Sequence, residues 1–207
     1  MTGKFESLED EKRERILRAA FLEFAEKGYD QASTNAIVKN AGIGKGMLFY
    51  YFKNKKALYY YLMKYSLNVI TEEYFQRIDI TESDFIERFK QASQVKMETY
   101  LENPELFRFT GTFLVQQEEN LSEDLKKRLN DVQKQGFSII YDNIDYSLFR
   151  KDIDVEKAFN LIRWSIDGYQ NEIKERLKGQ NLAEINFDPL WEEFYEYLEV
   201  LKKTFYS

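Results

Sequence analysis

Residues 34–58 contain two short helical patterns joined by a glycine, and no other stretch constrains the fold as tightly. Thr34 is of a type that caps helices, and Gly42 supplies the backbone freedom needed to leave the helix that follows. A second helix is predicted over residues 45–51. Two short helices joined by such a turn form a helix-turn-helix, whose second helix can enter a DNA major groove about 12 Å wide. The apolar positions expected to face inward are Ile37, Val38, Ala41, Ile43, Leu48 and Phe52.

The charge of this stretch supports the same interpretation. Residues 31–56 hold five lysines and no aspartate or glutamate, in a chain with 30 basic and 36 acidic residues. Residues 1–56 carry 11 basic and 8 acidic residues, a net charge of +3, whereas residues 57–207 carry 19 and 28, a net charge of −9. Lysines near phosphates release condensed counterions, and DNA repels an acidic body. A basic head on DNA and an acidic body that projects away from it are therefore expected. A solvated basic face without a partner is the alternative.

An ordered set of residues between 15 and 58 matches a known pattern. The matching residues are Arg15-Ile16-Leu17 with Ala19-Ala20, Gly28-Tyr29, Thr34 with Ile37, Ala41-Gly42-Ile43, Gly46 with Leu48, Tyr51-Phe52, and Lys55 with Leu58. In these positions the segment resembles the N-terminal DNA-binding domain of the TetR family of bacterial transcriptional regulators. The resemblance implies an all-α fold of about nine helices. It also implies a helix-turn-helix DNA-binding domain at residues 1–54 and a helical effector-binding and dimerisation domain at residues 55–207.

The resemblance also implies where DNA is contacted. By position, the contacts fall on Thr34, Asn35, Gly44, Lys45, Gly46, Met47, Tyr50, Tyr51, Lys53 and Lys55. Lys45 and Tyr50 are the strongest candidates for contacts in the groove. Gly44 replaces the family's usual serine or threonine cap, Phe49 replaces a common phosphate-binding tyrosine, and Val38 replaces a small alanine. Because the first two changes remove hydroxyl donors, the remaining tyrosines and the lysines are expected to carry more of the contact with the DNA backbone.

The rest of the chain is helical in pattern, with almost no strand signal and two prolines. A capping box is predicted at residues 7–10 for the first helix. Lys55 is predicted to begin a long helix that links the two domains and reaches as far as Tyr74, and a rigid helix of this kind can couple two sites. Further helices are expected after caps or breaks at residues 81–84, 103–104, 122, 154 and 189, and the one after residue 122 is expected to reach about residue 144.

Two apolar stripes near the C-terminus are expected to form a dimerisation pair. The first comprises Val155, Phe159, Ile162, Ile166, Tyr169, Ile173 and Leu177, and the second comprises Leu190, Phe194, Leu198, Leu201 and Phe205. Trp164 and Trp191 widen these faces. In the resembled family such a pair packs on its symmetry mate, and a two-fold protein binds a palindrome. The alternative is that both stripes fill the core of one chain, and the sequence does not decide between the two.

The body is rich in aromatic residues, which suggests a site for a small-molecule effector. Of the 34 aromatic residues, 26 lie in residues 57–207. A pocket lined by them would suit an apolar, planar or cationic molecule, although an ordinary core accounts for the same residues. The effector would favour a conformation in which the two recognition helices no longer match the operator, so that the repressor is released. A regulator that lacks an effector, and that binds a protein partner or activates transcription, is the alternative. The candidate pocket residues are Tyr65, Phe89, Met97, Tyr100, Phe107, Phe113, Tyr141 and Trp164.

The chain has no cysteine and no histidine. Disulfides, thiolate metal sites, cysteine nucleophiles and the commonest general base are therefore excluded. An enzyme is not expected, and one based on carboxylates is a remote alternative; no cofactor or metal is predicted. No signal peptide is expected, and the longest apolar runs of about seven residues fall short of the roughly 20 that span a bilayer. A cytoplasmic protein without a membrane segment is predicted.

Overall fold

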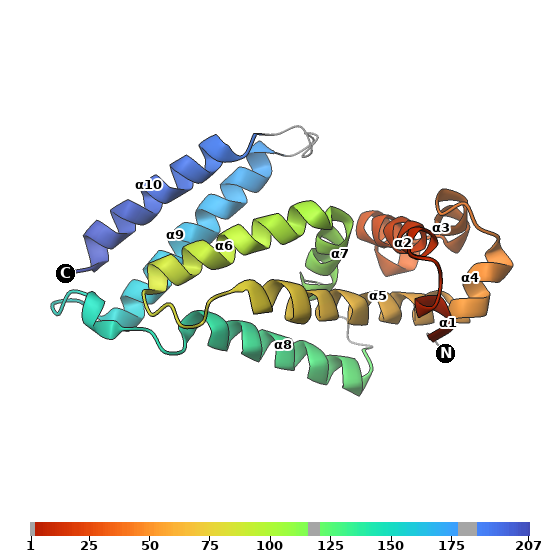
Figure 1. The fold of residues 1–207 in the computed structure, drawn as a ribbon, viewed down its shortest axis with the longest axis horizontal. Helices are drawn as coiled ribbons and strands as arrows, with labels where there is room; N and C mark the ends of the chain where they lie inside the picture. The colour runs from red at the N-terminus through yellow and green to blue at the C-terminus, as the bar shows by residue number, and fades with distance from the viewer. Residues whose placement is uncertain (1–2, 116–120, 178–185) are drawn as a thin grey trace. The chain divides into compact units, whose positions relative to one another are not determined.

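The computed structural model describes residues 3–115, 121–177 and 186–207, and for residues 112–115 and 174 it describes the backbone alone. Within these ranges the chain is α-helical, as predicted (Figure 1), and the β pairing consists of one isolated bridge between Phe149 and Tyr206. None of the described helices combines the length and the apolar character needed to cross a bilayer. The helices are α1 (Gly3–Glu6), α2 (Asp10–Gln31), α3 (Thr34–Asn40), α4 (Lys45–Phe52), α5 (Lys55–Val69), α6 (Phe85–Glu102), α7 (Pro104–Val115), α8 (Glu123–Tyr141), α9 (Val155–Arg176) and α10 (Asp188–Phe205).

Two compact units divide the chain. Unit 1 comprises Met1–Phe75 and Glu102–Lys134, and unit 2 comprises Gln76–Leu101 and Gln135–Ser207. The helix-turn-helix segment lies in unit 1, and the last two helices lie in unit 2. The boundary predicted after residue 54 falls within unit 1, and as a division of function it stays a prediction.

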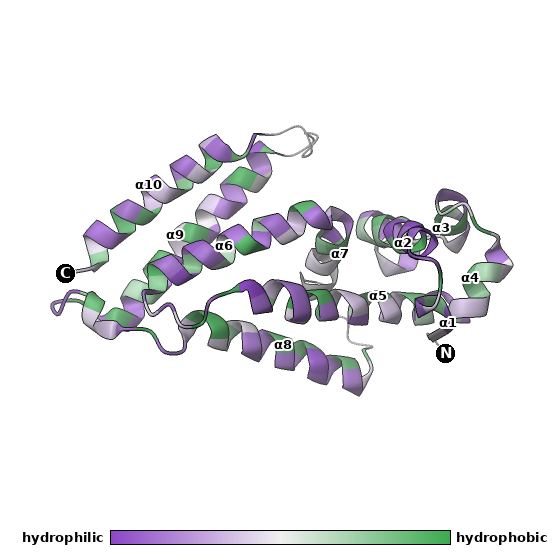
Figure 2. Cartoon of the chain, in the orientation of Figure 1, coloured by the Kyte–Doolittle hydropathy of each residue, from purple (hydrophilic) through white to green (hydrophobic). Residues whose placement is uncertain are grey.

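Unit 1 is built around α2, α5 and α7. The rings of Phe21 and Phe24 on α2 lie 5.3 and 6.3 Å, between centroids, from that of Phe109 on α7. Leu62 and Met63 of α5 are fully buried in the same core. Apolar and polar residues alternate along the helices (Figure 2), as expected for helices that bury one face. This core is the support on which α3 and α4 are held.

Unit 2 joins the start of α6 to α9 and α10. Asp84 caps α6, because its Oδ1 accepts hydrogen bonds from the backbone N–H groups of Ile86 and Glu87 at 2.9 and 3.1 Å. The hydroxyl of Tyr206, just beyond α10, donates to the same carboxylate at 2.7 Å. Lys202 of α10 lies 3.3 Å from it as well. These polar contacts fix the end of α10 on the start of α6.

Two predicted caps are wrong. The cap of α3 is Ser33, whose Oγ accepts from the backbone N–H of Ala36 at 3.4 Å, and Thr34 is the first residue of that helix. The capping box at residues 7–10 is not formed, since α2 begins after Glu9 without a side-chain cap. The hydroxyl of Ser7 instead donates to the carbonyl of the α1 residue Lys4 at 3.1 Å. The short helix α1 therefore takes up the residue that was expected to cap α2.

One predicted helix end is wrong, and another is confirmed. The helix α8 ends at Tyr141 rather than near residue 144, and Asn143 beyond it has a left-handed φ of +58°. The helix that begins at Lys55 continues past Val69 through a π-helical turn, Ile70–Tyr74, which matches the predicted reach. The expected starts of α6, α7, α9 and α10 are confirmed within a few residues.

The apolar stripes of α9 and α10 lie inside unit 2. Ile162 and Ile166 of α9 are buried with Phe194 and Leu198 of α10. The hydroxyl of Tyr169 on α9 donates to the carbonyl of Leu190 on α10 at 3.0 Å. The stripes therefore pack within one chain, which is the alternative that the sequence left open. Whether the same helices also pack on a second copy stays a prediction.

Candidate nucleic-acid interface

The turn between α3 and α4 is a Schellman turn. Gly42 has a φ of +65°, in the left-handed region that glycine enters without a steric penalty. Its N–H donates to the carbonyl of Lys39 at 3.2 Å, and the N–H of Ile43 donates to the carbonyl of Val38 at 3.0 Å. Ile43 packs against the core of unit 1. The glycine turn predicted from the sequence is confirmed, and it fixes the direction in which α4 leaves α3.

The helix α4 has a buried side and an exposed side. Leu48 and Phe52 are buried in unit 1, as predicted. Lys45 and Gly46 are exposed, and 62% of Tyr50 is exposed. The candidate DNA contacts that are half-buried are Thr34, Met47 and Tyr51, and the other exposed ones are Asn35, Gly44 and Lys53. The helix is thus anchored by apolar side chains while ammonium and hydroxyl groups remain available on its outer side.

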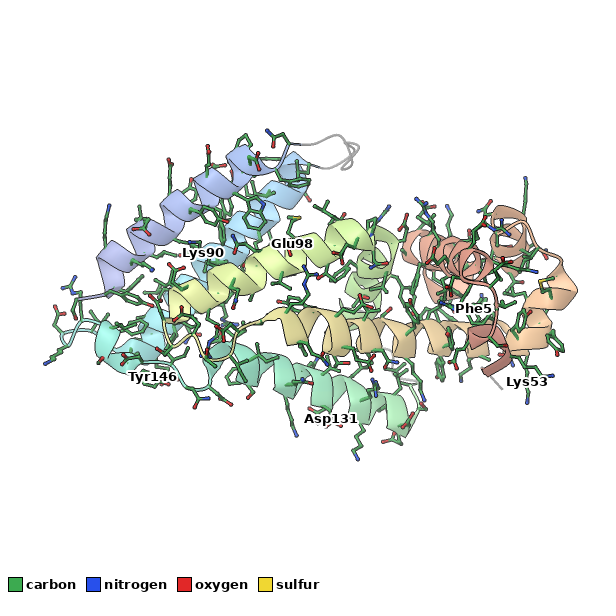
Figure 3. All side chains as sticks on the ribbon, in the orientation of Figure 1. Phe5, Lys53, Lys90, Glu98, Asp131 and Tyr146 are labelled. Atoms are coloured by element: carbon green, nitrogen blue, oxygen red, sulfur yellow. The ribbon has the colours of Figure 1, made fainter. Side chains whose placement is uncertain are left out.

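The corner between α4 and α5 is formed by Lys53 and Asn54. Lys53 has a φ of +50°, which is uncommon for a residue other than glycine. The Oδ1 of Asn54 accepts from the backbone N–H of Ala57 at 2.8 Å and so caps α5. Figure 3 shows Lys53 at the outer edge of the fold, beside the end of α4. This tight corner keeps Lys53 exposed next to the exposed side of α4.

Lys55 contacts protein groups rather than open solvent. Its Nζ donates to the carbonyls of Asp30 and Ala32, at 3.1 Å in each case. The same atom lies 4.9 Å from the centroid of the Tyr29 ring. These contacts satisfy carbonyl groups at the end of α2 and fasten the start of α5 to the link before α3. The geometry of Lys55 favours a structural role, in which its side chain joins the start of α5 to the end of α2.

The segment before α2 packs against α4, a contact that the sequence patterns did not reveal. Phe5 of α1 is fully buried (Figure 3), with its ring centroid 4.7 Å from that of Phe52 and 5.4 Å from that of Tyr61. The Nζ of Lys4 donates to the hydroxyl oxygen of Tyr50 at 2.8 Å. This bond raises the pKa of Lys4 above its ordinary value, and burial raises the pKa of Tyr61 to about 12. The sequence signal for this contact was Phe5, the one apolar side chain among residues 2–7.

The residues proposed to line an effector pocket are divided between the two units. Tyr65 and Phe107 pack on the core of unit 1, whereas Phe89 and Tyr141 pack on the core of unit 2. Trp164 is 60% exposed on α9. In the described ranges no group of three or more acidic side chains is arranged to hold a metal ion. The pocket stays a prediction. Met97 and Tyr100 are half-buried on α6, and the side chain of Phe113 lies outside the described residues.

The Schellman turn, the buried side of α4 and its exposed outer face together have the geometry of a helix-turn-helix, the class of fold that binds DNA. Residues 16–62 match the family described as bacterial regulatory proteins, tetR family. An HTH-type transcriptional regulator of Staphylococcus aureus (strain USA300) is 29% identical over 149 residues, which cover 72% of this chain and 73% of the relative. Residues 16–62 thus carry the DNA-binding domain of the TetR family, and over most of its length the chain is similar to a DNA-binding transcriptional regulator.

Solved structures show the same fold over 91–100% of the chain. A TetR family transcriptional regulator from Chloroflexus aurantiacus J-10-FL has a TM-score of 0.70 at 22% identity, covering 100% of this chain and 98% of its own. FadR from Bacillus subtilis, solved in complex with stearoyl-CoA, has a TM-score of 0.55 at 22% identity, covering 91% of this chain and 96% of its own. At such identities the likeness shows the fold alone.

Replacing Gly44 with serine is expected to stabilise α4 and to strengthen DNA binding. Gly44 occupies the N-cap position without a side-chain hydrogen bond, and a Cβ added there meets nothing within 4 Å. Serine caps better than glycine by a few tenths of a kcal/mol, and its hydroxyl adds a phosphate donor worth about fivefold in affinity. Thermal unfolding and DNA titration measure the two effects. Gly44→Ala, which lacks the hydroxyl, is the matched control, and equal affinities for the two variants would contradict the prediction.

Proposed function

We propose that this regulator binds a palindromic operator as a homodimer, represses transcription from it, and is released by a small apolar, aromatic or cationic effector. The observation that carries the proposal is the outer face of α4, where Lys45 and Tyr50 are exposed within a segment, residues 31–56, that has no acidic residue. One recognition helix of eight residues, Lys45–Phe52, contacts few base pairs. A second copy doubles the readout, and its symmetry requires a palindrome.

The proposed DNA contacts are ordered by where the side chains lie. Lys45 and Tyr50 are proposed to contact the groove, and Lys53 a flanking phosphate. Gly46 is exposed and a Cβ there meets nothing within 4 Å, so the absence of a side chain allows the DNA to approach the helix closely. The remaining proposed contacts, near the phosphates, are Thr34, Asn35, Gly44, Met47 and Tyr51. Lys55 is proposed to act through the packing of α5 on α2.

The proposed dimer surface consists of the apolar side chains that α9 and α10 leave exposed. These are Leu161 and Trp164 on α9 and Tyr197 and Val200 on α10. They lie on the sides of the two helices that the buried stripes do not use. Large apolar side chains that two packed helices leave exposed favour an interface there. A second copy of the chain is the proposed occupant, since a palindromic site requires two recognition helices.

An effector is proposed from the composition of the body and from one structural relative. Residues 57–207 contain 26 aromatic residues, and FadR from Bacillus subtilis is described in complex with stearoyl-CoA. An acyl thioester or another apolar ligand is therefore the class to screen first. An effector that stabilises the DNA-incompetent conformation by about 3 kcal/mol more than the competent one weakens DNA binding roughly a hundredfold. Equal affinity of the effector for free and DNA-bound protein would exclude this mechanism.

Fluorescence anisotropy with the DNA upstream of the coding sequence tests the proposal. The expected result is binding that is at least about a thousandfold tighter than to a scrambled duplex at the same salt, with two protomers per site. Acyl-CoA thioesters, free fatty acids and polycyclic apolar molecules are then added to the complex. Release by one chemical class supports an effector. Retention of DNA in every case, together with an activating effect in a reporter assay, favours the alternative of a regulator without a small-molecule effector.

A further inference from the structure

The ammonium group of Lys4 lies beside the exposed ring of the recognition helix. Its Nζ is 2.8 Å from the hydroxyl oxygen of Tyr50 and 4.8 Å from the centroid of the same ring. Lys4 and Tyr50 are both exposed. The two residues are 46 positions apart in the sequence, and they belong to α1 and α4, both in unit 1. A positive charge from outside the helix-turn-helix is thereby added to the exposed face of α4.

The direction of the hydrogen bond determines what the pair offers to a ligand. A lysine ammonium has three donors and no acceptor, so the hydroxyl oxygen of Tyr50 must be the acceptor. The hydroxyl proton of Tyr50 is then free to donate elsewhere, and Lys4 keeps donors that Tyr50 does not use. Both side chains therefore present donors, and one of the two is charged. A phosphate oxygen, an acceptor with negative charge, is the ligand that this pair matches.

Phe5 holds Lys4 in this place. The ring of Phe5 is fully buried and contacts three aromatic rings, those of Tyr51, Phe52 and Tyr61, with centroids 4.7–5.6 Å apart. A lysine on an unanchored segment would lose backbone and side-chain entropy on binding, and this loss would oppose binding. Because Phe5 is packed in the folded protein, much of this entropy is already lost before DNA binds. Lys4 is thus pre-organised beside α4 before any ligand arrives.

We propose that Lys4 and Tyr50 together form a site for one backbone phosphate of double-stranded DNA, with Lys4 supplying the charge and the Tyr50 hydroxyl a second donor. The site extends the DNA-binding surface from α3 and α4 to α1. The proposal rests on the proposed function, and it changes the role of Tyr50 from a groove contact to a phosphate contact. A dimer would present two such sites, one at each half-site.

The test is a double-mutant cycle with Lys4→Gln, Tyr50→Phe and the double variant, titrated against an operator duplex at several salt concentrations. Lys4→Gln is expected to weaken binding about tenfold and to make the salt slope shallower by about 2 per dimer, since each phosphate contact contributes roughly 0.9. Tyr50→Phe is expected to weaken binding about threefold with little change in slope. The double variant is expected to bind no more weakly than about tenfold, because the pair acts on one phosphate.

The control is Lys126→Gln on α8, which removes the same charge from an exposed lysine whose Nζ lies 2.9 Å from Glu123. It should leave the slope unchanged. An unchanged salt slope for Lys4→Gln would overturn the composite site. So would a double variant whose loss of DNA affinity equals the product of the two single losses. Neither result would contradict the proposed function. If the wild-type protein fails to bind any operator selectively, the proposed function is what fails. Circular dichroism confirms that each variant is folded, and none of the substituted side chains is buried.

Discussion

Replacing Arg88 with methionine is expected to lower the free energy of unfolding of unit 2 by about 3–5 kcal/mol. Arg88 on α6 is 1% exposed, and its side chain donates hydrogen bonds to backbone carbonyls. Its Nε donates to Glu82 at 2.6 Å, and its two other nitrogens donate to Ile80 at 3.0 Å and Ile139 at 3.3 Å and to Asp142. Methionine fills much of the volume of the buried side chain but leaves these carbonyls without their donors.

Urea unfolding, followed by circular dichroism at one fixed protein concentration, measures the effect. Arg88→Lys keeps the charge but not the planar fork that reaches several carbonyls at once, so an intermediate loss is expected. The matched control is Arg150→Met, because Arg150 forms an exposed ion pair with Asp152 at 2.7 Å, and exposed pairs of this kind contribute little to stability. If Arg88→Met and Arg150→Met lost the same stability, Arg88 would not be the link between α6 and the end of α8.

Replacing Trp164 with glutamate is expected to dissociate the proposed dimer and to weaken operator binding at least a hundredfold. In a two-fold interface the same residue occurs on both partners, so each substitution buries two carboxylates without partners. Each buried carboxylate costs several kcal/mol. The wild-type indole instead adds apolar area to the proposed interface, because it is 60% exposed in the single chain. A monomer retains one recognition helix and therefore loses the gain from binding two half-sites.

Sedimentation velocity at micromolar concentration and operator titration measure the two losses together. Tyr146→Glu is the matched control, because Tyr146 is also an exposed aromatic residue of unit 2 but lies outside α9 and α10 (Figure 3). It should leave both dimerisation and DNA affinity close to wild type. A Trp164→Glu protein that sediments as a dimer would show that the interface lies elsewhere.

The helix-turn-helix could be predicted because its determinants are local. The turn depends on Gly42 reaching a left-handed φ, and Leu48 and Phe52 bury at a spacing that one helix dictates. The cap at Ser33 was missed because Ser33 and Thr34 are adjacent residues with equivalent capping hydroxyls. Local patterns of this kind decide which helices form, and their ends vary by a residue or two.

The parts that the sequence did not reveal depend on contacts between distant residues. Phe5 finds its partners in α4 and α5, and Lys55 finds carbonyls at the end of α2, so neither neighbourhood shows in a local pattern. The stripes of α9 and α10 have the spacing of any amphipathic helix. Only the fold shows that Ile162 and Phe194 face one another inside unit 2 while Trp164 remains exposed.

Selection of bound duplexes from a random DNA library, with the purified wild-type protein and with Lys45→Ala in parallel, tests the central claim most directly. The wild-type protein is predicted to enrich an inverted repeat whose half-sites lie about 10 base pairs, or a multiple of that distance, apart. Each enriched duplex should bind two protomers, and Lys45→Ala should enrich the repeat weakly or not at all. Recovery of no common sequence by the wild-type protein, or equal enrichment by both proteins, would contradict the account of α4 as the helix that reads DNA.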